Sequence, residues 1–582
     1  MQPLLSIQNL SVAFIAESGI THALKNISFS VNKGEIVAIV GESGSGKSVT
    51  SLSILQLLPS PPAKYVSGEI FFSENVNEQI DLLKKDKASL QDIRGNKIAM
   101  IFQEPMTSLN PVLTCGDQVM EAILTHKKDL PASRQVSKQI AKQKTIEWFE
   151  RVKLPDPVSV FNRYPHQLSG GQKQRVMIAM AMCCEPSLLI CDEPTTALDV
   201  SVQKMILQLI KELQQQTGMA VIFITHDLGV VAEIADRIIV MYKGEIAEQN
   251  TVQQIFLNPQ HPYTKGLLAC RPILHKKGER LPVVSDFLAM NSVETPSMAS
   301  LLKIETTIPT SDLRPQTSTL LRIQNLSVWF PSKKTFLGKP LSFTKAVDDV
   351  NFEIYKGETM GLVGESGCGK TTLGRTLLRL IEPTAGKIIY DGIDLTAKKK
   401  DELRSLRKDV QIIFQDPYSS LNPRITIGSA ITEPLKVHHI VSGDKARKEK
   451  AIELLEKVDL KPEHFNRYPH EFSGGQRQRI VIARALVLNP SFIVCDESVS
   501  ALDVSVQAQV LNLLNDLKKE FGFTVIFISH DLSVVRYISD RIMVMNQGKI
   551  EEMGNADDVY YRPQSAYTQK LIAAIPKGLP VQ

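Results

Sequence analysis

The chain has 582 residues, which corresponds to about four folding units at roughly 150 residues each. Apolar residues make up 43% and charged residues 22%, the balance of an ordinary globular protein, and a net charge of +5 is too small to indicate DNA or RNA as the main partner. The apolar runs are far shorter than the roughly 20 residues that a membrane-spanning helix needs, so the sequence predicts no span.

Residues 1–10 contain no basic segment followed by an apolar core, so no secretory signal is expected.

The chain repeats itself once. Lys47 and Lys370 are 323 positions apart, and His226 and His530 are 304 positions apart. Solenoid proteins repeat every 20–50 residues or so, which is far shorter than the spacing in this chain. The long spacing indicates a duplicated domain rather than an array of short repeats. The matching segments are 5–14 with 321–330, 41–48 with 364–371, 162–166 with 466–470, and 197–203 with 501–507.

Each copy alternates short β-branched runs with longer amphipathic segments. The runs 35–40 and 187–191 predict buried parallel strands, and 202–213 predicts a helix. This alternation predicts an α/β fold with a mainly parallel sheet in each copy. Between the copies, polar residues and scattered prolines predict a linker. The predicted units are a first domain at 1–270, a linker at 271–318 and a second domain with a C-terminal tail at 319–582.

A glycine-rich segment, 41–48, follows the first predicted strand and has the spacing of a P-loop. In such a loop, backbone N–H groups and a helix N-terminus surround a phosphate. Lys47 is then expected to reach the terminal phosphates of a nucleotide, and Ser48 to bind Mg²⁺. The second copy places Lys370 and Thr371 in the same way. An incidental glycine-rich turn is the alternative, and its recurrence in the same context counts against it.

The strand at 187–191 ends in Asp192 and Glu193, and the second copy repeats the pair as Asp496 and Glu497. The end of a buried strand is a costly place for charge unless something compensates it. We predict that Mg²⁺ compensates the first carboxylate of each pair. The second carboxylate then faces the γ-phosphate and acts as general base on attacking water. The alternative, acids that cap a helix, is weakened by the two P-loops.

Two segments with Ser-Gly-Gly-Gln, 168–172 and 472–476, lie about 20 residues before Glu193 and Glu497. Together with the P-loops and the Asp-Glu pairs, they resemble the ATP-binding-cassette (ABC) ATPases over nearly all of the chain outside the linker and tails. The resemblance implies two cassettes, each with a RecA-like core and a helical subdomain that begins at Ser-Gly-Gly. It also implies that this segment contacts ATP on the opposite cassette, which gives two competent composite sites.

The resemblance assigns further roles by position. Gln103 and Gln415 match the Q-loop, which touches Mg²⁺ and senses the membrane partner, and His226 and His530 match the switch histidine at the γ-phosphate. Asp199 and Asp503 fall in the D-loop.

Phe14 and Phe330 match the position that stacks on adenine, with a plain core role as the alternative, because strand aromatics are common. The predicted ATP-binding residues are Phe14, Gly41, Glu42, Ser43, Gly44, Ser45, Gly46, Lys47, Ser48, Ser169, Gly170, Gly171, Gln172 and Asp199 in the first half, and Phe330, Gly364, Glu365, Ser366, Gly367, Cys368, Gly369, Lys370, Thr371, Ser473, Gly474, Gly475, Gln476 and Asp503 in the second. The predicted metal ligands are Ser48, Gln103, Asp192, Thr371, Gln415 and Asp496, and the predicted catalytic residues are Glu193, Glu497, His226 and His530.

The two halves differ at a few positions without losing a catalytic group. Ser498 replaces Pro194, and Arg484 replaces Met180. Cys368 lies inside the second P-loop, where a nearby helix N-terminus would lower the pKa of a thiol and make it reactive. A small, tolerated residue is the alternative reading of this cysteine.

Three runs resemble the ATPases of bacterial oligopeptide, dipeptide and nickel importers. These are 102–111, mirrored by 414–423, then 162–169, and 261–267, echoed weakly by 565–571. Such importers usually use two ATPase chains, and each half here resembles one of them. The fused form resembles the ATPases for microcin C-type peptides or glutathione.

Seven cysteines without repeated Cys-x-x-Cys spacing fit neither a disulfide framework nor a zinc ribbon, and indicate a reduced, cytosolic chain. Related importers often carry clustered cysteines after each cassette. Here Cys270 stands alone, and no cysteine follows His530. One thiolate cannot hold an iron–sulfur cluster, so none is predicted, and ATP and Mg²⁺ are the expected cofactors.

The resemblance implies partners outside this chain: two integral-membrane permease subunits and an extracytoplasmic solute-binding protein. It places the chain peripherally on the cytoplasmic face of the bacterial inner membrane, without direct contact to nucleic acid. The main alternative is a soluble tandem-cassette ATPase that acts on ribosomes or nucleic acid, and an exporter component is the next. The solute is left open among short peptides, peptide-like antibiotics, glutathione, nickel and other small solutes.

Overall fold

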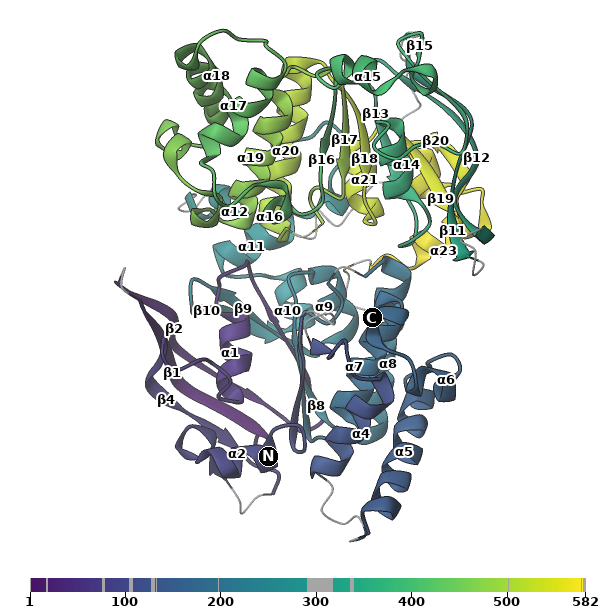
Figure 1. Ribbon diagram of the computed structural model, residues 1–582. Coiled ribbons are helices and arrows are strands. Elements are labelled where there is room, and N and C mark those ends of the chain that lie inside the picture. Colours follow the sequence, from purple (N-terminus) through teal and green to yellow (C-terminus); the bar gives the residue numbers. More distant parts are fainter. Residues whose placement is uncertain are drawn as a thin grey trace.

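The computed structural model forms two similar halves, each with a six-stranded sheet, a four-stranded sheet and a set of helices (Figure 1). Most of the predicted linker, 290–317, lies outside the described residues. The structure describes residues 2–16, 19–75, 79–103, 108–126, 131, 133–196, 198–289, 318–334, 340–500, 502–576 and 578.

The six-stranded sheet of the first half has the order β10-β9-β3-β8-β7-β6. Its strands pair in parallel except for β9 and β10, which are antiparallel. The inner strands are apolar and β-branched, and they are buried on both faces, as expected for a parallel sheet. The strands are β3 (Ile36–Val40), β6 (Ile98–Ile101), β7 (Leu188–Asp192), β8 (Ala220–Ile224), β9 (Arg237–Tyr242) and β10 (Glu245–Thr251).

The second half repeats this sheet in the same order, β16-β17-β18-β13-β19-β20. The predicted α/β fold and the duplication are therefore confirmed. The strands are β13 (Thr359–Val363), β16 (Val410–Ile413), β17 (Phe492–Asp496), β18 (Thr524–Ile528), β19 (Arg541–Asn546) and β20 (Lys549–Asn555).

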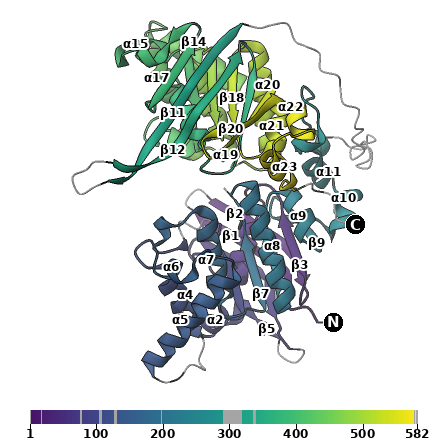
Figure 2. The same ribbon diagram turned by 90° about the vertical axis from the view of Figure 1, so that its right-hand side faces the viewer.

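A separate antiparallel sheet in each half was not anticipated from the sequence. In the first half its apolar side chains form one core with alternate residues of β3, so it covers one face of the central sheet. Figure 2 shows the antiparallel sheet of the second half at the front, with its two long strands in teal. The strand orders are β2-β1-β4-β5 and β12-β11-β14-β15. The strands are β1 (Leu5–Ala16), β2 (Gly19–Val31), β4 (Ala63–Phe72), β5 (Ile80–Asp81), β11 (Thr319–Lys334), β12 (Pro340–Tyr355), β14 (Ala385–Tyr390) and β15 (Ile393–Asp394).

Helices of the first half cover the central sheet and form a subdomain, α4 to α7, beside it (Figure 1). None of the helices that the structure describes in either half is long and apolar enough to cross a membrane. The first-half helices are α1 (Lys47–Ile54), α2 (Lys87–Ile93), α4 (Cys115–His126), α5 (Arg134–Arg151), α6 (Pro157–Phe161), α7 (Gly170–Met182), α8 (Val200–Thr217), α9 (Leu228–Ile234), α10 (Val252–Leu257), α11 (Pro262–Ala269) and α12 (Val284–Ala289), with 3₁₀ turns η1 (Leu82–Lys84), η2 (Pro165–Gln167) and η3 (Pro272–Leu274).

The second half has an equivalent helical subdomain built around α17, α18 and α19 (Figure 1). Its helices are α14 (Lys370–Leu377), α15 (Lys400–Leu406), α16 (Pro417–Ser420), α17 (Ile427–Val437), α18 (Asp444–Lys457), α19 (Gly474–Leu486), α20 (Val504–Phe521), α21 (Leu532–Ile538), α22 (Ala556–Tyr561) and α23 (Ala566–Ala573), with 3₁₀ turns η4 (Leu395–Ala397), η5 (Pro462–Asn466) and η6 (Pro469–Glu471).

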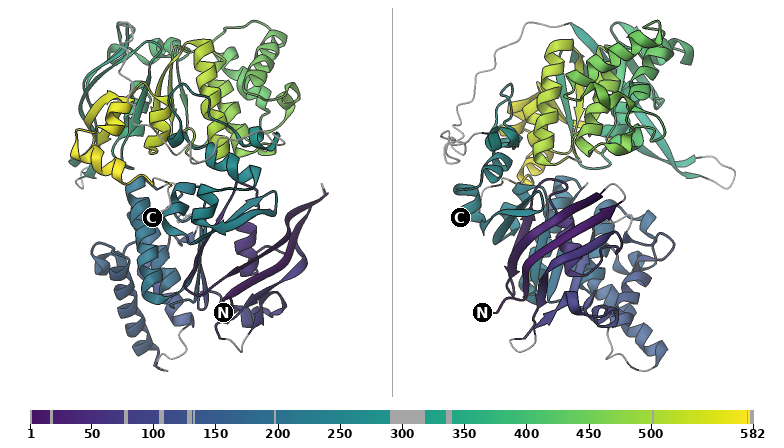
Figure 3. Two further views of the ribbon diagram at one scale, coloured as in Figure 1. Left: turned by 180° about the vertical axis from the view of Figure 1, so that it is seen from behind. Right: turned by 90° about the vertical axis from the view of Figure 1, so that its left-hand side faces the viewer.

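The two halves are stacked, and the segment after the first cassette packs on the second (Figure 3). Asn512 of α20 makes two hydrogen bonds with Leu281, donating to its carbonyl (2.8 Å) and accepting from its N–H (2.9 Å). The Tyr537 hydroxyl donates to the carbonyl of Glu279 (2.6 Å). One buried apolar cluster includes Leu281 together with side chains of α20. The apolar core of the second half thus extends across the interface between the halves.

Candidate nucleotide-binding and active sites

The first P-loop runs from β3 into α1. Gly46 has φ 105°, and a Cβ there would lie 2.9 Å from the carbonyl oxygen of Ala23, so only glycine fits. Lys47 opens the helix and is buried, with 6% of its surface exposed. Its Nζ donates to the carbonyl oxygens of Gly41 (2.8 Å) and Glu42 (2.9 Å). Burial lowers the pKa of Lys47, against the raising effect of nearby carboxylates.

The second P-loop has the same form. Lys370 donates to the carbonyl oxygens of Gly364 (2.8 Å) and Glu365 (3.0 Å), and its Nζ lies 3.8 Å from Sγ of Cys368. Cys368 is only 6% exposed, and burial raises the pKa of its thiol despite the charge of Lys370. These observations favour the small, tolerated residue over the reactive thiol.

Each P-loop hydroxyl lies beside the carboxylate at the end of a central strand. Ser48 Oγ donates to Asp192 Oδ1 (3.1 Å), and Thr371 Oγ1 donates to Asp496 Oδ1 (2.9 Å). Burial raises the pKa of both aspartates. Each site thus offers a hydroxyl oxygen and a buried carboxylate whose negative charge is not fully neutralised. Mg²⁺ prefers oxygen ligands of this kind. The residues present therefore fit the predicted magnesium sites.

Glu193 lies in the left-handed region (φ 47°) directly after β7, at the centre of a polar cluster. Its carboxylate accepts from Gln103 Nε2 (3.0 Å) and Thr196 Oγ1 (3.0 Å), and Nδ1 of His226 lies 3.4 Å away. Burial alone would raise the pKa of Glu193, but the hydrogen bond and charge of His226, with the charge of Lys47, lower it to about 2. Burial alone would lower the pKa of His226. The hydrogen bond and negative charge of Glu193 outweigh burial, so the pKa of His226 is raised.

Glu497 has the same surroundings. It has φ 50° and accepts from Gln415 Nε2 (2.8 Å), and Nδ1 of His530 lies 3.6 Å from its carboxylate. Burial opposes ionisation, yet His530 and Lys370 lower the pKa of Glu497. The structure thus brings together the predicted glutamine, glutamate and histidine in both halves, although they come from three separate elements.

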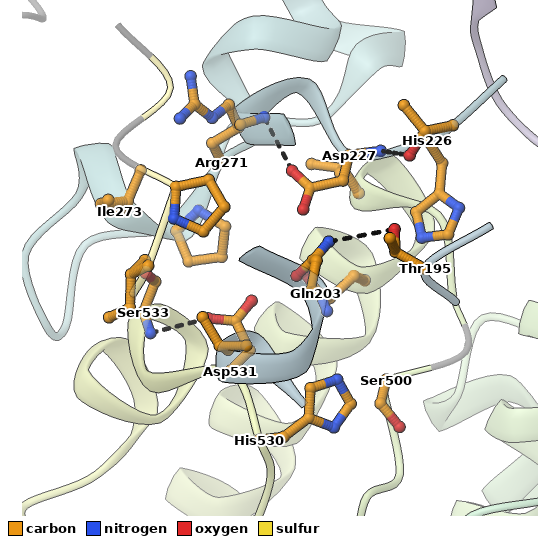
Figure 4. Close-up of a pocket in the computed structure, with 18 of the residues that line it drawn as sticks. Thr195, Gln203, His226, Asp227, Arg271, Ile273, Ser500, His530, Asp531 and Ser533 are labelled. Atoms are coloured by element: carbon orange, nitrogen blue, oxygen red, sulfur yellow. Dashed lines mark hydrogen bonds between the residues drawn. The ribbon is translucent and has the colours of Figure 1, made fainter. Parts of the chain in front are cut away.

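A cavity of about 160 Å³ lies between the halves and is lined by both (Figure 4). His226 of the first half and His530 of the second half both line it, and each is followed by an aspartate that caps a helix (Figure 4). Asp227 accepts from Gly229 N (2.8 Å), and Asp531 accepts from Ser533 N (2.8 Å). The caps fix the loops that carry the two histidines.

The Ser-Gly-Gly-Gln segments open α7 and α19 with a capping box. The Ser169 hydroxyl accepts from Gln172 N (3.4 Å), and Gln172 Oε1 accepts from Ser169 N (3.0 Å). Ser473 and Gln476 repeat both bonds, at 3.4 and 3.1 Å.

The two glycines in each segment face different surroundings. A Cβ at Gly171 would lie 2.7 Å from Val202, and one at Gly475 would lie 2.4 Å from a valine of α20, so these glycines let the helices pack closely. A Cβ at Gly474 would meet no described atom within 4 Å. A Cβ at Gly170 would lie 3.7 Å from Leu198, an ordinary contact distance, so the first glycine of each pair is less crowded than the second.

The D-loop aspartates, by contrast, have different partners. Asp503 crosses the interface, where its carboxylate accepts from the backbone N–H (2.8 Å) and the hydroxyl (3.1 Å) of Ser43 in the first P-loop. Asp199 instead caps its own helix, α8, by accepting from Val202 N (2.9 Å). At one site the second half thus contacts the first P-loop through its D-loop, whereas the pairing of each P-loop with the opposite Ser-Gly-Gly-Gln segment stays a prediction.

Sequence reasoning gave no role to two tyrosines that contact the P-loops. The hydroxyl of Tyr263 accepts from Glu42 N (2.9 Å), and that of Tyr567 accepts from Glu365 N (3.1 Å). Their spacing of 304 residues, equal to that of the two histidines, was the available signal.

The remaining predicted residues lie as follows. Phe14 is half-buried against the core of the first antiparallel sheet, whereas Phe330 is 42% exposed, which disfavours a plain core role for Phe330. Cys270 is buried, and burial raises the pKa of its thiol to about 12. The absence of an iron–sulfur cluster stays a prediction.

Comparison with protein-family models gives two matches. The ABC transporter model matches residues 24–196 and 347–500, and the model of the oligopeptide/dipeptide transporter C-terminal region matches 247–289 and 552–580. Each cassette match is thus followed by one match to the C-terminal region.

Curated relatives match over almost the full chain. The glutathione import ATP-binding protein GsiA of Pectobacterium atrosepticum is 48% identical over 575 residues, covering 99% of this chain and 90% of that protein. The protein of the same name from Escherichia coli K12 is 48% identical over 581 residues, with the same coverage. A solved dimer of an ATP-binding cassette with ADP and phosphate, in a post-hydrolysis state, is 30% identical with a TM-score of 0.37, covering 41% of this chain and 99% of that one. The chain belongs to the ABC transporter family, as an ATP-binding subunit that carries two cassettes, each followed by the C-terminal region of oligopeptide and dipeptide transporters.

Proposed function

We propose that this chain is the ATPase of an importer that takes up short peptides or glutathione-like solutes through separate membrane subunits. The observation that supports this most strongly is the order of its parts, cassette and C-terminal region twice in one chain, which it shares over nearly its full length with the glutathione import proteins. The site geometry supports ATP hydrolysis as the driving reaction.

ATP is expected to displace the lysine from the P-loop carbonyls. Lys47 now donates to Gly41 and Glu42, and a terminal phosphate would offer it a stronger, charged acceptor. Its buried position leaves few competing water contacts. Lys370 is placed to do the same in the second half.

Glu193 and Glu497 are proposed to orient and activate the attacking water. Both are ionised near neutral pH because a histidine and a P-loop lysine stabilise the charged form. Each glutamate is also fixed by a Q-loop amide, so its carboxylate has a defined direction. A fixed carboxylate lowers the cost of aligning water with the γ-phosphate.

Mg²⁺ would be held by Ser48 and Asp192 in one site and by Thr371 and Asp496 in the other, with Gln103 and Gln415 nearby. When bound, it would neutralise negative charge on the phosphate oxygens of the nucleotide. The two hydroxyls and carboxylates already lie within hydrogen-bond distance, so binding needs little rearrangement.

We propose that a helix of a membrane subunit docks in a groove on the second half. The groove, of about 280 Å³, lies between the central sheet and the helical subdomain. Arg484 lines it, donating to the Ser420 carbonyl (3.0 Å) and lying 3.3 Å from Glu433. Val437 at its edge is 46% exposed. An apolar rim with a charged wall suits an amphipathic helix.

These proposals place the chain at the cytoplasmic face of a bacterial inner membrane, together with two permease subunits and an extracytoplasmic binding protein. The division into 1–270, 271–318 and 319–582 also remains our proposal. Within that linker, η3 and α12 belong to the stretch that lies against the second cassette.

The first test is affinity purification of the chain from gently solubilised membranes, with mass spectrometry of the co-purifying proteins. Recovery of two multi-span subunits is expected. Recovery of ribosomes, or of no membrane protein, would favour the soluble tandem ATPase instead.

The second test is uptake of labelled glutathione and of labelled tripeptides by cells that lack the gene. We expect the wild-type chain to restore uptake of one of them, and a chain with Glu193→Gln and Glu497→Gln to restore neither. Restoration by the double variant would contradict ATP-driven import.

A further inference from the structure

The C-terminal region of each half reaches back to the P-loop of the same half. Tyr263 from α11 and Tyr567 from α23 place their hydroxyl oxygens 2.9 and 3.1 Å from the backbone nitrogens of Glu42 and Glu365. These glutamates are the second residues of the P-loops. The two residues of each pair are far apart in the sequence, by 221 positions in the first half and by 202 in the second. The same contact in both halves argues against an accidental one.

The segment that presents Tyr263 is held by hydrogen bonds. Glu248 of β10 accepts from the backbone nitrogens of Gln260 (2.9 Å) and His261 (3.0 Å), and Nδ1 of His261 accepts from Tyr263 N (3.1 Å). The second half repeats each bond: Glu552 accepts from Gln564 and Ser565, and the Ser565 hydroxyl accepts from Tyr567 N (3.2 Å). The capping residue differs between the halves, yet the tyrosine and its position are the same.

The tyrosines stay protonated at physiological pH. Tyr263 is fully buried, and its ring lies 4.3 Å from that of Tyr242, between centroids. Burial raises the pKa of Tyr263, and it raises that of Tyr567 to about 12. Each hydroxyl is therefore neutral and serves as the acceptor for the P-loop N–H.

The peptide that joins Gly41 to Glu42 is fixed from two sides. Its N–H, on Glu42, donates to the Tyr263 hydroxyl, and its carbonyl, on Gly41, accepts from Lys47. The P-loop lysine thus rests on a peptide whose orientation the tyrosine holds. In the second half, the peptide that joins Gly364 to Glu365 is held in the same way by Tyr567 and Lys370. Rotation of this peptide would change both the loop that surrounds the phosphates and the position of the lysine.

We propose that Tyr263 and Tyr567 are positioning residues, through which the C-terminal region of each half sets the ATP affinity of the P-loop in that half. The inference rests on the proposed binding of ATP at the two P-loops. It gives the C-terminal regions a role in the nucleotide cycle. It also predicts that a partner or solute that moves α11 or α23 alters ATP binding at one defined site.

The test uses Tyr263→Phe and Tyr567→Phe in the full chain, which keep the ring and remove the acceptor. ATP binding is measured by photolabelling with 8-azido-ATP, followed by cleavage at a protease site placed within 290–317 and separation of the halves. We expect each variant to need about three- to tenfold more nucleotide for half-maximal labelling of its own half, the effect of one lost hydrogen bond, with less than about twofold change in the other. KM for ATP should rise, with kcat nearly unchanged.

Tyr242→Phe is the matched control, because its ring stacks on Tyr263 but its hydroxyl does not bind the P-loop amide. It should leave labelling and melting temperature unchanged. Unchanged labelling in both tyrosine variants would overturn the proposal, as would equal losses in both halves with a lowered melting temperature. If Tyr263→Phe does not fold, the half-buried Tyr567 decides the question. Absence of labelling in the wild-type chain would instead contradict the proposed function.

Discussion

The two nucleotide sites contain equivalent lysine, glutamine, aspartate, glutamate and histidine residues, but their contacts across the interface differ. The glutamate, histidine, glutamine and hydroxyl–carboxylate contacts agree to within a few tenths of an ångström between the halves. Among the described residues, a contact between a P-loop and the opposite D-loop is made at the first P-loop alone, through Ser43 and Asp503, whereas Asp199 caps its own helix. The contacts within each cassette are thus the same in both halves, whereas the contacts across the interface differ between the two sites.

A second difference lies beside the magnesium ligands. Arg375 places a guanidinium nitrogen 3.6 Å from Asp496, and the first half has Leu52 at the equivalent position. The second site therefore carries an additional positive charge. Arg375 is 43% exposed, so solvent screens much of its effect.

The largest expected effect is on hydrolysis. Glu193→Gln combined with Glu497→Gln should reduce ATP turnover by roughly 10²–10⁴-fold, the range for loss of a general base, with nucleotide binding retained. Phosphate release and 8-azido-ATP labelling measure the two quantities. Turnover within twofold of wild type would exclude the assigned role. The single variants then show how much each site contributes, and equal losses would indicate functionally equal sites.

Cross-linking tests the unequal closure directly. Without nucleotide, the pair Ser43→Cys and Asp503→Cys should form a disulfide with a yield at least about fivefold above that of Ser366→Cys and Asp199→Cys, because only the first pair starts within hydrogen-bond distance. Non-reducing gels measure the yield after brief oxidation.

All seven native cysteines are buried, which keeps the background of this experiment low. Equal yields from the two engineered pairs would show that the sites close alike in solution. Addition of ATP to the slower pair should raise its yield if the second site closes on nucleotide.

The charge difference should appear in Mg²⁺ binding. Arg375→Leu removes a cation near Asp496 and should tighten Mg²⁺ at the second site about two- to fivefold, the scale of an exposed charge pair. Leu52→Arg should weaken the first site to a similar extent. Mg²⁺ titrations of ATP turnover, each with the other site inactivated by its Glu→Gln change, resolve the two. Weaker Mg²⁺ binding in Arg375→Leu, or tighter binding in Leu52→Arg, would show that Arg375 acts through something other than its charge.

The smallest effect concerns stability and pH. The pKa of Glu193 falls from 4.5 to about 2, so its contribution is present above pH 4.5 and is lost as the pH falls toward 2. The pKa of His226 is raised above 6.5, so its contribution is complete below pH 6.5 and is lost as the pH rises through the raised value. The pair thus stabilises the fold most between pH 4.5 and 6.5.

His226→Gln should therefore lower the free energy of unfolding more at pH 6 than at pH 9. Denaturant titrations at the two pH values measure this. His530→Gln, where the pKa of Glu497 is also lowered, is the matched comparison. An equal loss at both pH values would mean that the pair is held by packing rather than by charge.

The repeated motifs predicted most of each site because their residues are ordered by the parallel sheet. The P-loop follows β3, Asp192 ends β7, and the histidine follows β8, three strands that are neighbours in the sheet. Carboxyl ends of parallel strands meet at one edge, so sequence order was sufficient to bring these residues together. The antiparallel sheet was missed, since pairing of β1 with β4 joins segments that no local pattern connects.

The sequence by itself determined the duplication and the α/β fold and predicted the residues that would face a nucleotide, because each is recorded in short contiguous segments. Only the tertiary structure decided that Tyr263 and Tyr567 hold the P-loops, that Asp503 reaches Ser43 while Asp199 does not, and that burial raises the pKa of Cys368. These features depend on distances between distant segments and on exclusion of water. Equal motifs in two halves of one chain can therefore acquire unequal surroundings.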